Sequence, residues 1–198
     1  QQCNSLKPKI LALYANPKYQ NAPQLLINAE INELLNNDLR LHVMIDAITT
    51  SDSLENNIDT IQPEIILYSG HIFKNPDPEP HKLYLHNNNN LRIGEGYSII
   101  DFINKLNNNT NLKLVILLAC HSYNIIDYLN ETLNISFITI EEFAHDIAML
   151  SFLKGCSTKI SDIYSEEHNI GGNIENIFNA GIEQFKSDKY IIGNPNPK

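Results

Sequence analysis

One stretch of the chain decides the fold: Leu112-Lys113-Leu114-Val115-Ile116-Leu117-Leu118-Ala119-Cys120-His121-Ser122. Its apolar residues run almost without interruption for the length of a strand, and a cysteine follows them. A second stretch has the same form and ends on a histidine: Glu64-Ile65-Ile66-Leu67-Tyr68-Ser69-Gly70-His71. Short apolar runs that contain β-branched residues are typical of strands buried on both faces of a parallel sheet. The two stretches therefore predict two buried strands, one ending at His71 and the other at Cys120.

The residues at these two strand ends suit nucleophilic catalysis. If the strands are neighbours, their ends lie roughly 5 Å apart. They then meet at the carboxyl edge of the sheet, where ligands bind in open α/β folds. An imidazole at this edge can take the proton of a thiol and later protonate a leaving amine. We therefore predict that Cys120 is a nucleophile and that His71 is its base, although an isolated cysteine is more often a buried, inert residue.

The sequence around both residues resembles a known family. Ser69-Gly70-His71 and Leu118-Ala119-Cys120-His121-Ser122 are similar to the histidine and cysteine motifs of CHAT domains, which are caspase-like cysteine peptidases related to separase and gingipains. The 49 positions from His71 to Cys120 are close to the roughly 50 that separate the same residue types in caspases. The resemblance covers most of residues 7–186. Its clearest parts outside the two motifs are residues 9–17, 25–35, 143–155 and 174–185.

The resemblance implies a specific set of roles. His71 and Cys120 are the catalytic dyad of a cysteine endopeptidase, and the backbone N–H groups of Ile72 and Cys120 bind the oxyanion. No metal or organic cofactor is implied. The family usually has Gly after the catalytic histidine, whereas this chain has Ile72. A β-branched residue does not adopt positive φ cheaply, so we expect an altered oxyanion site.

The resemblance also bears on substrates and partners. Related enzymes often cleave after basic residues, and this implies an acidic substrate pocket. Four acidic residues near the predicted rim are candidates for that pocket: Glu95, Asp127, Glu141 and Glu142. The expected partners are a protein or peptide substrate and a regulatory domain or activating partner.

Strand and helix patterns alternate along the chain. Strands are predicted at residues 9–15, 39–45, 64–71, 112–120, 135–140 and 190–193, and a short hairpin at residues 81–93. Helices are predicted from the 16–23 loop to residue 35, from Ser51 or Ser53 to residue 61, and at residues 97–106, 124–129, 141–153 and 174–185, with Gly155 ending the fifth. This order predicts a three-layer α/β sandwich of the caspase-like kind, in which helices flank a mostly parallel central sheet.

Length and composition limit the classes of function. The 198 residues suit one domain, predicted at residues 7–193 between flexible termini at 1–6 and 194–198. The net charge of −9 argues against a nucleic-acid binder, and no apolar stretch has the length of a membrane span. Three scattered cysteines fit a reducing compartment, so we expect a cytoplasmic protein.

Other interpretations of the sequence remain open. A catalytically weak CHAT-like domain could instead act as a protein-interaction module. A TIR-like nucleotide-processing domain would use Glu30 and Glu33, but acids on a helix are more often solvated. His81 and His86 are interpreted as surface residues. Together with His71 they fit no zinc pattern, so no metal site is predicted.

Overall fold

A computed structural model of the protein describes residues 7–18, 25–36, 38–73, 81–120, 122–128, 134–141 and 146–188. Its five-stranded sheet has the order β2-β1-β3-β7-β8, and every neighbouring pair is parallel. The strands of this sheet are β1 (Ile10–Tyr14), β2 (Val43–Asp46), β3 (Ile65–Ser69), β7 (Leu114–Leu118) and β8 (Ser136–Ile138).

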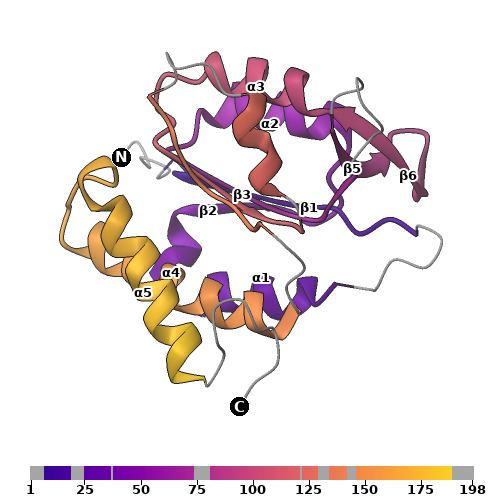
Figure 1. Ribbon diagram of the computed structural model, residues 1–198. Helices are drawn as coiled ribbons and strands as arrows, with labels where there is room; N and C mark the ends of the chain where they lie inside the picture. The colour runs from indigo at the N-terminus through magenta and orange to yellow at the C-terminus, as the bar shows by residue number, and fades with distance from the viewer. Residues whose placement is uncertain are drawn as a thin grey trace, which may run out of the picture.

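Helices cover both faces of this sheet (Figure 1). One face carries α2 (Ser51–Ile61) and α3 (Ile99–Asn107). The other face carries α1 (Ile27–Leu35), α4 (Asp146–Ser165) and α5 (Ile174–Ser187). The 3-10 turns are η1 (Asp38–Leu41), η2 (Ser122–Tyr128) and η3 (Gly171–Asn173). The predicted three-layer α/β sandwich is confirmed.

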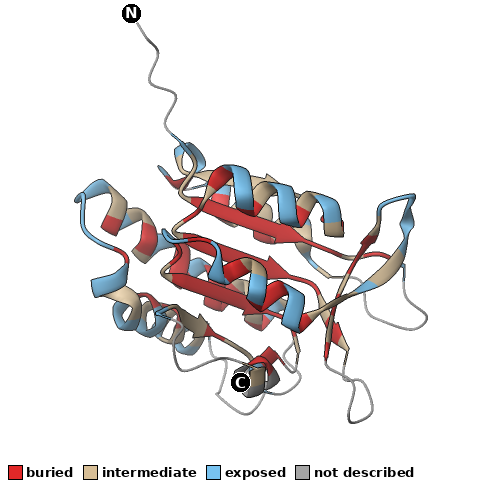
Figure 2. Cartoon of the chain, turned by 90° about the horizontal axis from the view of Figure 1, so that it is seen from above, coloured by how far each residue is buried: buried red, intermediate tan, exposed pale blue. Residues whose placement is uncertain are grey.

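Alternation along the strands builds a separate core on each face of the sheet. Leu11 and Leu13 of β1 pack into the core under α2 and α3, whereas Ile10, Ala12 and Tyr14 pack into the core over α1, α4 and α5. Strands β1, β3 and β7 are buried at every position. Figure 2, which looks down on the face that carries α2 and α3, shows strands of the sheet as buried and the outward sides of the helices above them as exposed. This burial on both sides explains why their sequences are continuously apolar.

A second, antiparallel sheet lies beside the carboxyl edge of the first (Figure 1). It consists of β4 (His71–Phe73), β5 (Lys82–Asn87) and β6 (Asn90–Ser98). His86 attaches this sheet to the main body: its backbone N–H donates to Thr49 O at 2.9 Å, and its Nε2 accepts from the Asn16 N–H at 3.3 Å. The predicted hairpin at residues 81–93 is therefore present as β5 and β6, although β6 continues to Ser98. His71 begins β4, which pairs with β5 as a third strand of this sheet.

Several predicted boundaries are wrong. The strands expected to end at His71 and Cys120 end at Ser69 and Leu118. The helix expected at residues 141–153 runs from Asp146 to Ser165, and the helix expected at residues 124–129 is the 3-10 segment η2.

The segment expected as a strand at residues 39–45 begins with η1, and within it the strand that pairs with β1 starts only at Val43. Thr50, rather than Ser51 or Ser53, caps α2, because its side chain accepts from the Ser53 N–H while the Ser53 side chain accepts from the Thr50 N–H. This reciprocal pair is a capping box.

A further error concerns Gly155, which was expected to end a helix and instead lies inside α4. A Cβ at this position would lie 2.2 Å from the backbone oxygen of Ala180 in α5. Gly155 therefore allows the two helices to approach closely. The penalty of a glycine within a helix, about 1 kcal/mol relative to alanine, is offset by this packing. The predicted strand at residues 190–193 and both predicted flexible termini lie outside the described residues.

Candidate active site

The sheet places His71 and Cys120 at equivalent positions after two neighbouring strands. β3 and β7 pair in parallel register, and their last partners are Ser69 and Leu118. His71 and Cys120 each follow two residues later. The prediction that their strands are adjacent is confirmed, and both residues belong to the carboxyl edge of the sheet.

Gly70 allows a tight turn between β3 and His71. A Cβ on Gly70 would lie 2.3 Å from the Tyr68 hydroxyl and 3.0 Å from Ala15 O. The Tyr68 hydroxyl lies under this turn and donates to the carbonyl oxygens of His71 at 3.1 Å and Tyr84 at 3.2 Å. The buried Tyr68 side chain thus ties the start of β4 to β5, which explains why the turn has no room for a larger residue than glycine.

The environment of His71 suits a general base. Burial lowers the pKa of the imidazole, and the negative charge of Asp146 partly opposes that effect. The ring is therefore neutral at pH 7 and able to accept a proton. Its Nε2 atom is buried and has no hydrogen-bond partner among the residues that the structure describes.

Ser122 shapes the turn that presents Cys120. Its backbone N–H donates to Ala119 O at 3.2 Å, and its buried hydroxyl donates to Leu117 O at 3.1 Å. The same hydroxyl accepts from the Ile140 N–H at 2.7 Å. These bonds connect the end of β7 to the chain that follows β8, so the segment carrying Cys120 is fixed on both sides.

The two described cysteines have different surroundings. Cys120 is partly exposed, whereas Cys156 is buried in α4. The Cys156 thiol donates to Ile177 O at 3.5 Å, and burial raises its pKa to about 12. Thiolates are the reactive species, so Cys156 is inert. Cys3 lies outside the described residues.

Ile72 is a core residue. It pairs with Leu83 of β5, its side chain is only 8% exposed, and it belongs to the core that includes Tyr68 and Leu85. Its φ is not positive, because Gln62 and Glu167 are the non-glycine residues with positive φ in the described part of the chain. The isoleucine that replaces the usual glycine therefore packs in an extended strand.

Glu30 is buried, and its interpretation as a solvated helix residue is wrong. It lies on α1 with 3% of its surface exposed. Burial raises the pKa of Glu30 to about 7; the nearby Ser69 hydroxyl acts to lower this pKa, and the charge of Asp146 raises it further. Burial also raises the pKa of Tyr14, with Glu30 adding to the shift. Tyr14, Glu30 and Asp146 therefore interact electrostatically, and a lone acid in an apolar helix was the only sign of this in the sequence.

The two other histidines of the hairpin are also buried, contrary to their interpretation as surface residues. His81 and His86 are each 8% exposed. His81 Nδ1 lies 3.1 Å from the Tyr128 hydroxyl of η2, the turn that follows Cys120. His81 therefore connects the hairpin that contains His71 with the segment after the cysteine. Within the described residues, no group of three His, Cys, Asp or Glu side chains could hold a metal ion.

The structure describes the side chains of two of the four candidate residues for the substrate pocket. Glu95 of β6 accepts from the Ser51 hydroxyl at 2.9 Å and from the Asn87 amide at 2.7 Å, so its carboxylate holds the hairpin to α2. Glu141 is exposed at the end of the chain segment after β8. Glu142 and the side chain of Asp127 lie outside the described part of the structure. Their roles stay predictions.

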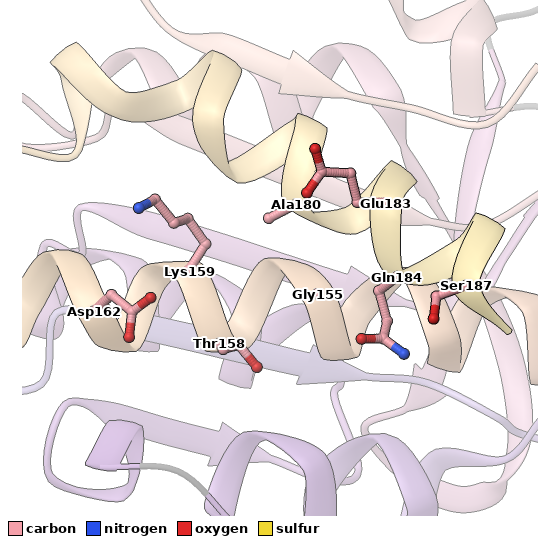
Figure 3. A pocket seen from close by; sticks show the side chains of 8 residues that line it. All are labelled: Gly155, Thr158, Lys159, Asp162, Ala180, Glu183, Gln184 and Ser187. Atoms are coloured by element: carbon pink, nitrogen blue, oxygen red, sulfur yellow. The ribbon is translucent and has the colours of Figure 1, made fainter.

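A hollow of about 310 Å³ lies away from these residues, between α4 and α5 (Figure 3). It is lined by polar side chains, including Lys159, Asp162 and Glu183, around the close approach at Gly155. Gly155 is nine residues along α4 from Asp146, which is roughly 13 Å at the rise of an α-helix. The hollow contains neither a thiol nor an imidazole, so it offers no nucleophile.

No protein-family model matches the chain, and no curated protein is significantly similar to it. No helix in the described segments is both long and apolar enough to cross a membrane. The functional assignment therefore depends on the residues at the carboxyl edge of the sheet.

Proposed function

We propose that this protein is a caspase-like cysteine endopeptidase of the CHAT type, which cleaves peptide bonds with the dyad Cys120 and His71. One observation carries the proposal: the register of β3 and β7 gives a partly exposed thiol and a neutral imidazole equivalent positions on neighbouring strands. A nucleophile and its base must come within reach of each other, and apo enzymes often hold them more loosely than a hydrogen bond.

The proposed reaction has two stages. His71 takes the thiol proton of Cys120, and the sulfur bonds to the scissile carbonyl carbon while the oxygen becomes negative. Backbone N–H groups of Ile72 and Cys120 stabilise this oxyanion. The His71 imidazolium then protonates the leaving amine as the C–N bond breaks, which leaves a thioester. Water, deprotonated by His71, attacks the thioester and releases the acid, and the proton returns to the thiolate.

The proposed substrate is a protein or peptide segment with a basic residue before the cleaved bond. The net charge of −9 and the acidic residues Asp146 and Glu141 near the ends of the strands favour a cationic segment electrostatically. A cytoplasmic location and control by a regulatory domain or activating partner belong to the same proposal.

A library of peptides with varied residues before the cleaved bond tests this function. We expect hydrolysis by the wild-type protein, with peptides containing Arg or Lys cleaved fastest, and a loss of at least about 1,000-fold in Cys120→Ala and in His71→Ala. Mass spectrometry of the products locates each cleavage. Hydrolysis that survives in Cys120→Ala would refute the proposal.

The burial of Ile72 favours a second candidate, a catalytically weak module that binds partner peptides. The residue that usually helps to form the oxyanion site here packs in an extended core strand. Losing one oxyanion donor costs about 3–4 kcal/mol of transition-state stabilisation, or roughly 100- to 1,000-fold in rate. Peptides that bind equally well to wild type and Cys120→Ala, without being cleaved by either, would favour this module.

A further inference from the structure

We propose that the contact between His81 and Tyr128 is a clasp, which holds the segment carrying Cys120 to the small sheet carrying His71 and thereby sets the geometry of the dyad. The inference rests on the proposed function only in taking His71 as the base for Cys120. His81 and Tyr128 are positioning residues in this account, because they act through the two residues of the dyad.

The two side chains of the clasp make a polar and an aromatic contact. His81 Nδ1 lies 3.1 Å from the Tyr128 hydroxyl, in a hydrogen bond to which either group can donate. The ring centroids are 6.0 Å apart, and the rings are inclined at 63°. His81 is buried, and Tyr128 packs against the core under α2 and α3. A hydrogen bond shielded from water is stronger than one on the surface, so removing one of its partners has a larger effect.

The histidine of the clasp is held to the sheet that contains His71. His81 directly precedes Lys82, which pairs with Phe73 of β4, the strand that begins at His71. The carbonyl oxygen of His81 accepts from the Ile99 N–H at 3.0 Å, so its backbone is also bonded to the start of α3. The imidazole of His81 therefore extends from a backbone that is fixed beside β4.

The tyrosine of the clasp belongs to the segment that follows Cys120. Tyr128 is the last residue of η2, and Ser122, the first, lies two positions after the cysteine. The Ser122 side chain fixes its own end of η2 by bonding to Leu117 O and the Ile140 N–H. Short 3-10 segments have poorer hydrogen-bond geometry than α-helices, so the position of η2 depends on contacts at both ends. The clasp is such a contact at the far end.

The main sheet alone does not fix the distance between His71 and Cys120. Both lie two residues beyond the last paired residues of β3 and β7. Tyr68 of β3 donates to the carbonyl oxygen of His71, and Ser122 donates to Leu117 O of β7, so each segment is held to its own strand. The clasp joins the two segments to each other. Its hydrogen bond has a preferred distance and direction, which apolar packing lacks.

The test is the ratio of the rates at which iodoacetamide alkylates Cys120 at pH 7 and at pH 9, measured by mass spectrometry. A thiol is largely ionised at pH 9 without help, so this ratio reports assistance by the imidazole rather than access to the sulfur. We expect Tyr128→Phe, which removes only the hydroxyl, to lower the ratio about three- to tenfold. In a His71→Ala background the same change should alter the ratio less than about twofold, because the clasp acts through His71.

Tyr97→Phe is the matched control for this experiment. Tyr97 of β6 donates to Glu55 of α2 at 3.0 Å, so the variant also loses one tyrosine hydrogen bond of the small sheet, but one that does not involve η2. Its ratio of alkylation rates should equal that of wild type.

Amide hydrogen exchange measures the clasp without relying on the dyad. The backbone N–H groups of Ser122 and Tyr123 are both hydrogen-bonded. In Tyr128→Phe and in His81→Phe they should exchange about five- to tenfold faster, the factor expected from the loss of one hydrogen bond. They should exchange at the wild-type rate in Tyr97→Phe.

The outcomes separate positioning from a purely structural role. Unchanged exchange in Tyr128→Phe would overturn the proposal. So would an unchanged ratio of alkylation rates in a protein where His71→Ala lowers it, or an equal effect of Tyr128→Phe with and without His71. If His71→Ala leaves the ratio unchanged while Tyr128→Phe speeds exchange, the dyad is rejected and the clasp stands. Thermal unfolding identifies any variant that fails to fold, and His81→Phe decides the question if Tyr128→Phe is lost.

Discussion

Replacing Glu30 by glutamine should make the protein more stable at pH 8 and should give no such gain at pH 4. Burial raises the pKa of Glu30 from its usual 4.5 to about 7. Below pH 4.5 the carboxyl is protonated in both folded and unfolded chains. As pH rises towards 7, the unfolded chain loses this proton first, so the folded state loses stability. A shift of this size corresponds to about 3 kcal/mol.

The measurement is the free energy of unfolding in urea for wild type and Glu30→Gln between pH 4 and 8. The difference between the two proteins should grow by about 3 kcal/mol from pH 4 to pH 8 and should change little above pH 8. Glu33→Gln is the control on the same helix and should show no such trend. A difference that stays constant with pH would mean that Glu30 is not a carboxyl with a raised pKa.

Replacing Ile72 by glycine should destabilise the protein by about 3–5 kcal/mol, because the change removes a buried isoleucine and loosens a strand. Ile72 packs in the core with Tyr68, Leu83 and Leu85. Ile72→Val, which keeps the β-branched shape, should lose only about 1 kcal/mol. Urea unfolding of both variants is the test. A loss below about 1 kcal/mol in Ile72→Gly would show that the side chain contributes little to the core.

The strands were the part of the fold that could be predicted best. The apolar runs that end near Ser69 and Leu118 are buried on both faces, and such burial leaves a continuous apolar pattern in the sequence. The pairing of these two strands also followed, because parallel α/β folds bring the carboxyl ends of their strands to one edge. Side-chain pattern and topology therefore sufficed to place His71 and Cys120 at the same edge.

The errors arose where distant contacts override local signals. Gly155 resembles a helix end in the sequence, but its missing side chain makes room for the backbone of α5. Glu30 resembles a solvated acid, but the packing of α1 against the body of the protein leaves only 3% of it exposed. His81 and His86 are bonded to Tyr128 and Asn16, which lie far away in the chain. Each of these residues contacts a part of the chain far from it in the sequence. The local pattern of apolar and polar residues therefore could not reveal the contacts.

The most direct test is the rate at which Cys120 reacts with iodoacetamide, measured by mass spectrometry across pH 5–9 in wild type and His71→Ala. We expect Cys120 to be alkylated at least about tenfold faster than Cys156, which is buried. We expect His71→Ala to slow the alkylation of Cys120 by a similar factor near pH 7, because the thiolate loses its imidazole partner. Equal labelling of the two thiols, or a Cys120 rate that does not depend on His71 at any pH, would contradict the dyad.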